Sequence, residues 1–283
     1  MEHNQAGATR PLNAIWLSDI HLGYKGCRAE FVLDFLNRNP ARIIYLVGDV
    51  IDIWALKRQF QWPESHQAVL RKLLDIAASG TRVVYIPGNH DDHCRDLCGQ
   101  RLLNIEILRE AVHRTAAGKR LLVLHGDEFD HAARCTRLHK IAGDLGYDFL
   151  LFLNRWGNRL RGLFGLPYWS LAYYVKNRVK NARAAIRAFE EAAAAEARRR
   201  GLDGIICGHI HQPEIRTIDG VLYCNDGDWV ESCTALVEHN TGRLELIHWG
   251  DLHQAVKCER AANDDIPRPL RLPSLGAVAS LTK

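Results

Sequence analysis

Residues 14–21 read Ala-Ile-Trp-Leu-Ser-Asp-Ile-His, a short apolar run followed at once by an aspartate and a histidine. Four further apolar runs continue in the same way into polar, metal-capable residues: 42–47 before Gly48-Asp49, 82–86 before Gly88-Asn89-His90-Asp91, 121–124 before His125-Gly126-Asp127, and 204–207 before Gly208-His209-Ile210-His211. Short continuous apolar runs are typical of strands buried on both faces of a sheet. The pattern therefore predicts buried strands that each end in functional side chains.

The segments around these runs predict a mixed α/β fold. Helical patterns over 28–37 and 63–78 separate the first three runs, which indicates βαβ units. Beyond His211 the pattern changes, because Asp219-Gly220 and Asn240-Thr241-Gly242 each join two short runs as hairpin turns. We therefore expect an α/β (α+β) fold of two packed mixed β-sheets flanked by helices.

One stretch, residues 131–200, has few strand signals and reads as a helical lid inserted over the strand ends. The expected core is then 13–130 together with 201–256, with flexible termini at 1–12 and 257–283. Nine of the 23 aromatic residues lie between Tyr147 and Tyr174. Residues 131–203 carry 14 Lys and Arg against 6 Asp and Glu, whereas the rest of the chain is mildly acidic. Such a basic block suits an anionic partner or, alternatively, forms a solvated helical face.

The eight cysteines show no repeated spacing, and the polar N-terminus has no apolar export signal. Reduced thiols and a cytoplasmic location are therefore expected. No apolar run approaches the ~20 residues of a spanning helix.

The strand ends are expected to meet at one edge of the fold, where ligands bind in doubly wound sheets. Carboxylate oxygens and imidazoles without thiolates favour Mn, Fe, Zn or a similar metal ion. Seven ligands are too many for one ion and suit two ions that share a carboxylate. The candidate metal ligands are Asp19, His21, Asp49, Asn89, His125, His209 and His211.

In sequence order, these five motifs resemble the calcineurin-like metallophosphoesterase superfamily, and the resemblance extends from about residue 14 to 250. It implies one metal ion, most often Mn2+, bound by Asp19, His21, Asp49 and His211. The second ion would be bound by Asp49, Asn89, His125 and His209, so that Asp49 bridges the two. It also implies that His90 is catalytic and that Asp91 orients His90. Asp52 is interpreted as the cap of the next helix, outside the site.

The insertion resembles the lid of the UDP-2,3-diacylglucosamine pyrophosphohydrolase group of lipid A biosynthesis. This likeness implies cleavage of UDP-2,3-diacylglucosamine to UMP and 2,3-diacylglucosamine 1-phosphate. It also implies a peripheral position on the cytoplasmic face of the inner membrane. The chain departs from that group at His90, where the group typically has Arg. The candidate substrate-binding residues are Asn89, His90, Lys176, Asn177, Arg178, Lys180, Asn181 and His209.

Three alternatives stay open at this point. The first is a metallophosphoesterase that acts on another nucleotide or a phospholipid-type phosphoester. The second is an inactive scaffold that binds membrane or protein through the insertion, although a scaffold has no need of seven metal ligands. A nucleic-acid enzyme is the third, but the aromatic and aliphatic stretch 163–175 suits lipid better, so no nucleic-acid partner is expected.

Overall fold

The computed structural model describes residues 11–131 and 180–250. The first half contains β1 (Leu12–Leu17), α1 (Ala29–Arg38), β2 (Ala41–Val47), α2 (Ile53–Arg58), α3 (Glu64–Ala78), β3 (Arg82–Ile86), η1 (Asp92–Leu97), β4 (Arg101–Leu102), β5 (Ile105–Ile107), β6 (Ala111–Arg114), β7 (Arg120–Val123) and η2 (Asp127–His131). The second half contains α6 (Lys180–Arg199), β8 (Gly204–Cys207), β9 (Glu214–Ile218), β10 (Val221–Asn225), β11 (Thr234–Glu238) and β12 (Leu244–His248).

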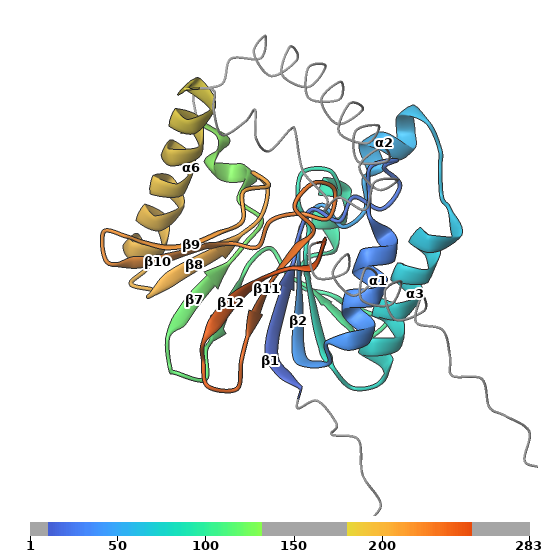
Figure 1. Cartoon of the computed structure of the whole chain (residues 1–283), viewed down its shortest axis with the longest axis horizontal. Coiled ribbons are helices and arrows are strands. Elements are labelled where there is room, and N and C mark those ends of the chain that lie inside the picture. The colour runs from blue at the N-terminus through green and yellow to red at the C-terminus, as the bar shows by residue number, and fades with distance from the viewer. Residues whose placement is uncertain (1–10, 132–179, 251–283) are drawn as a thin grey trace, which may run out of the picture.

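The strands form two sheets that pack face to face (Figure 1). One sheet has the order β12-β11-β1-β2-β3-β5-β4, and the other has the order β6-β7-β8-β10-β9. In the first sheet β1, β2 and β3 run parallel, with Ile15 opposite Ile44 and Ile44 opposite Val83. In the second sheet β7, β8 and β10 run parallel. The expected sandwich of two mixed sheets flanked by helices is confirmed.

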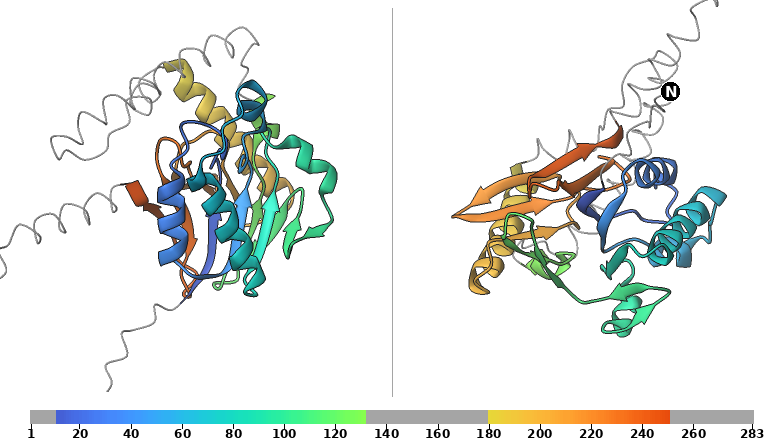
Figure 2. Two further views of the ribbon diagram at one scale, coloured as in Figure 1. Left: turned by 90° about the vertical axis from the view of Figure 1, so that its right-hand side faces the viewer. Right: turned by 90° about the horizontal axis from the view of Figure 1, so that it is seen from below.

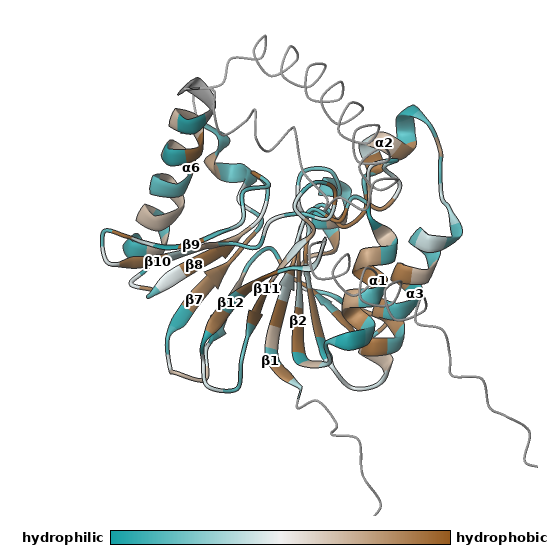
Figure 3. Cartoon of the chain, viewed as in Figure 1, coloured by the Kyte–Doolittle hydropathy of each residue, from teal (hydrophilic) through white to brown (hydrophobic). Residues whose placement is uncertain are grey.

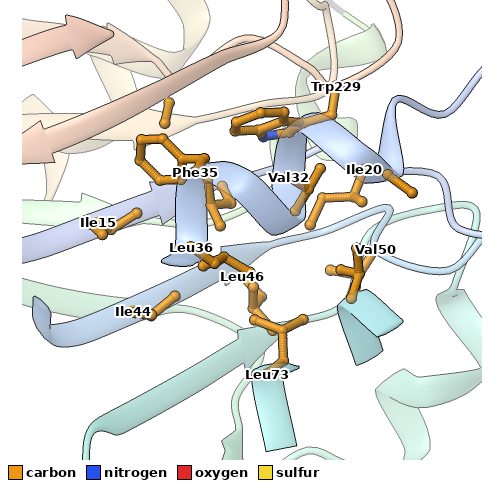
Figure 4. Close-up of a cluster of buried hydrophobic side chains, with 14 of the residues drawn as sticks. Ile15, Ile20, Val32, Phe35, Leu36, Ile44, Leu46, Val50, Leu73 and Trp229 are labelled. Carbon is orange, nitrogen blue, oxygen red and sulfur yellow. The ribbon is translucent and has the colours of Figure 1, made fainter. Parts of the chain in front are cut away.

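Helices α1 and α3 cover the outer face of the first sheet (Figure 2). The apolar face of α1 buries Val32, Phe35 and Leu36, and Figure 4 shows these side chains between the sheet and Trp229. The Phe35 ring lies 5.5 Å from that of Trp229. In α3, Val69, Leu73 and Ala77 recur every four residues, as one face of an α-helix requires.

The core between the sheets is formed by the alternate residues of the same strands. Trp16 and Tyr45 stack with ring centroids 5.6 Å apart and share one buried cluster with Val123 and Ile206 of the second sheet. Burial on both faces explains why inner strands such as β2 are largely hydrophobic in Figure 3.

Helix α6 covers the outer face of the second sheet. Its buried residues Phe189, Ala193, Ala194 and Ala197 pack against residues of that sheet, including Ile205 and Tyr223. Residues 180–199, expected to belong to the insertion, thus form part of the core layers. The remainder of the insertion, 132–179, and the expected flexible ends, apart from 11–12, lie outside the described residues.

The sequence patterns did not predict the elements between β3 and β7. This stretch contains η1, the short hairpin β4–β5 and the edge strand β6. Each of these strands has only two to four residues, too few to show a period-two pattern. Among the described residues no helix is long and apolar enough to cross a membrane.

Candidate metal centre

The proposed ligands all follow strands directly and lie at one edge of the sandwich. In Figure 1 the chain enters β1 at the lower edge, so the carboxyl ends of β1 and its parallel neighbours lie at the upper edge. Asp19 and His21 follow β1, Asp49 follows β2, and Asn89 and His90 follow β3. The second sheet contributes His125 after β7 and the pair His209 and His211 after β8. The site therefore lies across the top of both sheets.

Three overlapping groups of side chains bring their ligand atoms within 4.8 Å of one another. They are Asp19 with His21 and His211, then His21 with Asp49 and His90, and then Asp49 with His125 and His209. His21 links the first group to the second and Asp49 links the second to the third, so the three groups form one continuous cluster. The structure brings Asn89 to the same place, because its Oδ1 lies 3.2 Å from His125 Nε2.

The inner distances are short enough for shared cations. His211 Nε2 lies 3.1 Å from Asp19 Oδ1, and His125 Nε2 lies 3.4 Å from Asp49 Oδ2. His21 Nε2 lies 3.8 Å from Asp19 Oδ1 and is buried without a hydrogen-bond partner. A buried nitrogen without a partner is costly unless something binds it. A metal ion would meet that need.

The second ring nitrogen of three of these histidines is hydrogen bonded to the protein. His21 Nδ1 donates to Asp52 Oδ2 at 3.1 Å, and His125 Nδ1 donates to the Val47 carbonyl at 2.9 Å. His209 Nε2 donates to Asp130 Oδ1 at 2.7 Å. Such bonds fix the tautomer, so that the other nitrogen can bind a metal ion. The facing nitrogens are therefore Nε2 of His21 and His125 and Nδ1 of His209.

The electrostatics of the site favour cations. Burial disfavours a charged His21, but the hydrogen bond that it donates to Asp52 and the charges of Asp49 and Asp19 prevail and raise the pKa of His21 to about 9. For His125, burial is likewise outweighed by Asp49, and its pKa lies well above the usual range. The pKa values of Asp19 and Asp49 are lowered despite burial, because histidines lie next to them. The site thus attracts positive charge, as protons or as metal ions.

The backbone at the site is held in an uncommon conformation. Five of the seven proposed ligands have positive φ angles: Asp19 (50°), His21 (55°), Asp49 (53°), His209 (68°) and His211 (52°). Residues other than glycine rarely adopt this region, and each costs of order 1–3 kcal/mol unless the surroundings hold it. The strain is concentrated where the side chains must turn inward from the strand ends.

His90 is more exposed than the histidines around it, with 26 % of its side chain accessible. Its Nδ1 donates to Asp52 Oδ1 at 3.0 Å, which leaves Nε2 facing the site, 4.0 Å from Asp49 Oδ2. One face of its ring lies against Trp54 of α2, with ring centroids 4.3 Å apart. His90 is therefore held in one orientation with a free nitrogen toward the centre.

The expectation that Asp91 orients His90 is not met. The Asp91 carboxylate instead accepts hydrogen bonds from the backbone N–H groups of Gly88 (2.6 Å) and Val50 (2.8 Å). The tight turn after β3 directs this side chain back to backbone donors, so Asp91 shapes the loop that bears Asp49. Burial and the nearby charge of Asp49 raise its pKa.

Asp52 performs the role expected of Asp91. It caps α2 as expected, accepting from the Ala55 N–H at 2.7 Å, but it also binds His21 and His90. Hydrogen bonds from both histidines keep the Asp52 pKa low although burial would raise it. The signal was present in the sequence, because Asp52 lies three residues after Asp49 in the same loop.

A sixth strand-end motif was missed. Strand β10 is followed by Asp226-Gly227-Asp228, which combines an apolar run, a glycine and a carboxylate as three of the five motifs do. Asp226 is fully buried with Oδ1 2.7 Å from Ser18 Oγ, while Asp228 Oδ1 lies 3.9 Å from His211 Nδ1. The lack of a histidine or asparagine ligand made this motif inconspicuous.

The candidate substrate residues divide into two sets. Asn89, His90 and His209 lie at the centre described above. Lys176, Asn177 and Arg178 lie outside the described residues, and Lys180 and Asn181 begin α6.

The donor set fits divalent cations. Two carboxylates, four imidazoles and one amide oxygen, with no thiolate among the proposed ligands, suit borderline metals such as Mn, Fe or Zn. The ligand atoms converge, the tautomers of His21, His125 and His209 are fixed, and the surrounding field is negative. All three are required of a preformed site.

Comparison with known proteins found curated relatives and solved structures that are similar to this chain. A UDP-2,3-diacylglucosamine hydrolase of Neisseria gonorrhoeae is 26% identical over 229 residues, which cover 76% of this chain and 88% of the relative. A UDP-2,3-diacylglucosamine hydrolase of Xanthomonas campestris pv. campestris is 26% identical over 240 residues, with 80% and 94% covered. Among solved structures, the E. coli phosphoesterase Yfce aligns at 15% identity with a TM-score of 0.41, covering 83% of this chain and 98% of its own.

The family assignment rests on a broader match. The family model described as calcineurin-like phosphoesterase matches residues 12–213, which contain all seven proposed metal ligands. This range is well over half of the chain. The chain therefore belongs to the calcineurin-like phosphoesterase family and is a metal-dependent phosphoesterase.

Proposed function

We propose that this chain uses two divalent metal ions, Mn2+ by preference, to hydrolyse a phosphoanhydride. The two ions share Asp49 as a ligand. The observation that carries the proposal is the position of Asp49. Its carboxylate lies in one group with His21 and His90 and in a second group with His125 and His209. Asp19, His21 and His211 complete one ion's ligands, and Asn89, His125 and His209 complete the other's. Two cations so held neutralise phosphoryl charge and lower the pKa of a water molecule.

The chain's own residues then position the reaction. His90 Nε2 faces the centre and can donate a proton to the leaving oxygen or a hydrogen bond to the phosphoryl group. A positioned acid of this kind accelerates reactions by about 10²–10⁴-fold. Asp52 accepts the hydrogen on Nδ1, because a carboxylate only accepts, so the protonated ring of His90 donates from Nε2. Trp54 limits rotation of the ring from the other side.

For the substrate, we propose UDP-2,3-diacylglucosamine, cleaved to UMP and 2,3-diacylglucosamine 1-phosphate. The names and high coverage of the two relatives support this substrate class. The basic excess of residues 131–203 and the nine aromatics from Tyr147 to Tyr174 also support it, since they suit an anionic head with apolar chains. On the same grounds we propose peripheral association with the cytoplasmic face of the inner membrane.

A second candidate is hydrolysis of another nucleotide or phospholipid-type phosphoester. His90 favours it, because the lipid A group typically has Arg at this position. Arg binds a phosphate through two parallel hydrogen bonds, whereas His also transfers protons near neutral pH.

Product analysis separates the two candidates. Purified protein with Mn2+ is given UDP-2,3-diacylglucosamine in mixed micelles, and UDP-N-acetylglucosamine and a small activated phosphodiester in parallel. The proposal expects UMP and lipid phosphate, with little turnover of the non-acylated sugar nucleotide. Asp49→Ala serves as the inactive control. If the protein hydrolyses the small diester but not the lipid substrate, the dimetal chemistry is supported and UDP-2,3-diacylglucosamine is excluded as the substrate.

A further inference from the structure

Asp226 connects the two sheets directly beneath the metal centre. It follows β10 of the second sheet, is fully buried, and places Oδ1 2.7 Å from Ser18 Oγ at the end of β1. Ser18 Oγ lies 2.5 Å from Oδ2 of its neighbour Asp19, a proposed ligand. A chain of three side chains therefore runs from the second sheet to the ligand.

The hydrogen bonds between Asp226, Ser18 and Asp19 have fewer hydrogens than acceptors. The Ser18 hydroxyl has one hydrogen but three acceptors around it: Asp19 Oδ2, Asp226 Oδ1 and the Gly227 carbonyl at 3.0 Å. If both carboxylates were ionised, one would face a hydroxyl lone pair with no hydrogen between. The other oxygen of Asp226, Oδ2, is buried and has no hydrogen-bond partner. An ionised carboxylate in this position would be costly.

A neutral Asp226 removes the conflict. Its O–H then donates to Ser18 Oγ, and the Ser18 hydroxyl donates to Asp19. Burial acts in the same direction, raising the pKa of Asp226 well above its ordinary value, and the charge of Asp19 adds to it.

The two carboxylate oxygens of Asp19 have different partners. Oδ2 accepts from Ser18 and from the backbone N–H of His209 at 2.9 Å. Oδ1 is left facing His211 Nε2 and His21 Nε2. Only one oxygen is thus directed at the metal position.

Neighbouring residues leave room for this arrangement and hold it. A Cβ at Gly208 would lie 2.2 Å from Ser18 Oγ, so the glycine is required for close approach. Asn225 Nδ2 donates to the Gly208 carbonyl at 2.6 Å, which ties the turn before Asp226 to the loop of His209 and His211.

We propose that Asp226 is a positioning residue for the metal position formed by Asp19, His21 and His211, acting through Ser18 as a neutral hydrogen donor. The inference rests on the proposed dimetal function. Loss of such an outer partner typically lowers metal affinity about 10–100-fold.

Four variants test the proposal by Mn2+ affinity and stoichiometry, measured by equilibrium dialysis. Asp226→Asn keeps a neutral donor, whereas Asp226→Leu keeps the bulk without the donor, and Ser18→Ala removes the middle link. Thr234→Val is the matched control, because Thr234 Oγ1 donates to the Asp226 backbone carbonyl in the same buried turn. Thermal unfolding in EDTA checks that each variant folds.

We expect Asp226→Leu and Ser18→Ala to weaken one of two Mn2+ positions about 10–100-fold. Asp226→Asn and Thr234→Val should retain both. The infrared difference spectrum between the wild type and Asp226→Asn should contain the C=O band of one carboxylic acid, because the band of protonated Glu231 is common to both proteins and cancels. If Asp226→Leu does not fold, Ser18→Ala decides the matter.

The inference is overturned if Asp226→Leu or Ser18→Ala binds Mn2+ like the wild type, if Asp226→Asn binds it as weakly as Asp226→Leu, or if the difference spectrum lacks the acid band. A wild type that binds fewer than two ions would instead contradict the proposed function.

Discussion

Asp52 Oδ1 lies 3.0 Å from Nδ1 of His90, and this bond joins the cap of helix α2 to the proposed catalytic histidine. The second oxygen of the same carboxylate binds His21 Nδ1 at 3.1 Å. One side chain therefore fixes a residue that acts on substrate and a residue that binds metal.

Asp52→Asn should impair both turnover and metal binding. An asparagine offers one acceptor and one donor, so one histidine must move its hydrogen from Nδ1 to Nε2. At saturating Mn2+ we expect kcat to fall about 10²-fold or more, together with weaker metal binding through His21. Helix α2 keeps its cap, since Asn also caps helices.

The double variant with His90→Ala checks the connection. If Asp52 acts on turnover through His90, Asp52→Asn/His90→Ala should be no slower at saturating Mn2+ than His90→Ala alone. Multiplied losses in kcat would show that Asp52 acts independently of His90.

His90→Ala itself should retain both metal ions and lose about 10²–10⁴ in turnover. The reason is that His90 Nε2 faces the centre while the other side chains satisfy the ions. Metal content by elemental analysis and kcat with saturating substrate provide the two readouts. An equal loss of metal would make His90 a ligand, and unchanged turnover would remove it from the mechanism.

Asp49→Ala and His21→Ala should differ in how many ions they lose. In the proposed function Asp49 binds both ions, whereas His21 binds one ion together with Asp19 and His211, its partners in the first group. We expect Asp49→Ala to bind neither ion tightly and His21→Ala to weaken mainly one. Elemental analysis that found one ion or fewer per active wild-type chain would contradict the dimetal site.

The positions of the ligands could be predicted from the sequence because each ligand directly follows an apolar strand. Parallel strands end at a shared edge, so the order of motifs was enough to bring Asp19, Asp49 and His125 together. The roles of Asp52 and Asp226 could not be predicted in this way. Asp52 reads as a helix cap, and its contacts with His21 and His90 depend on three loops meeting in space. The positive φ angles at Asp19 and Asp49 likewise arise only from that convergence.

Gly88→Ala should disrupt the metal centre with little effect on the rest of the fold. A Cβ at Gly88 would lie 2.3 Å from Asp49 Oδ1 and 2.8 Å from His125 Nε2, so the added methyl displaces both ligands. We expect Mn2+ affinity to fall at least 10-fold. Gly250→Ala is the control, since its Cβ would meet Cys233 at an ordinary 3.5 Å. Equal Mn2+ affinity in the two variants would show that the loop at Gly88 shifts to accept the methyl group without displacing Asp49 or His125.

Glu231 gives a prediction about stability that does not involve the metal ligands. Its side chain is buried, its Oε1 has no hydrogen-bond partner, and burial raises its pKa from 4.5 to about 8. Between pH 4.5 and about 8, Glu231 therefore keeps its proton in the folded state, whereas the unfolded chain releases it. By linkage, the stability from this group is fully present below pH 4.5 and is lost as the pH rises toward 8.

Glu231→Gln should remove this dependence, because an amide has similar size and does not ionise. We expect the variant to gain stability relative to the wild type as the pH rises from 5 to 8. Urea unfolding of both proteins in EDTA at several pH values measures the difference while excluding metal binding. Using the difference between the two proteins cancels the titration of every other group. A constant difference across this range would mean that Glu231 is ionised in the folded protein, through a partner that offsets its burial.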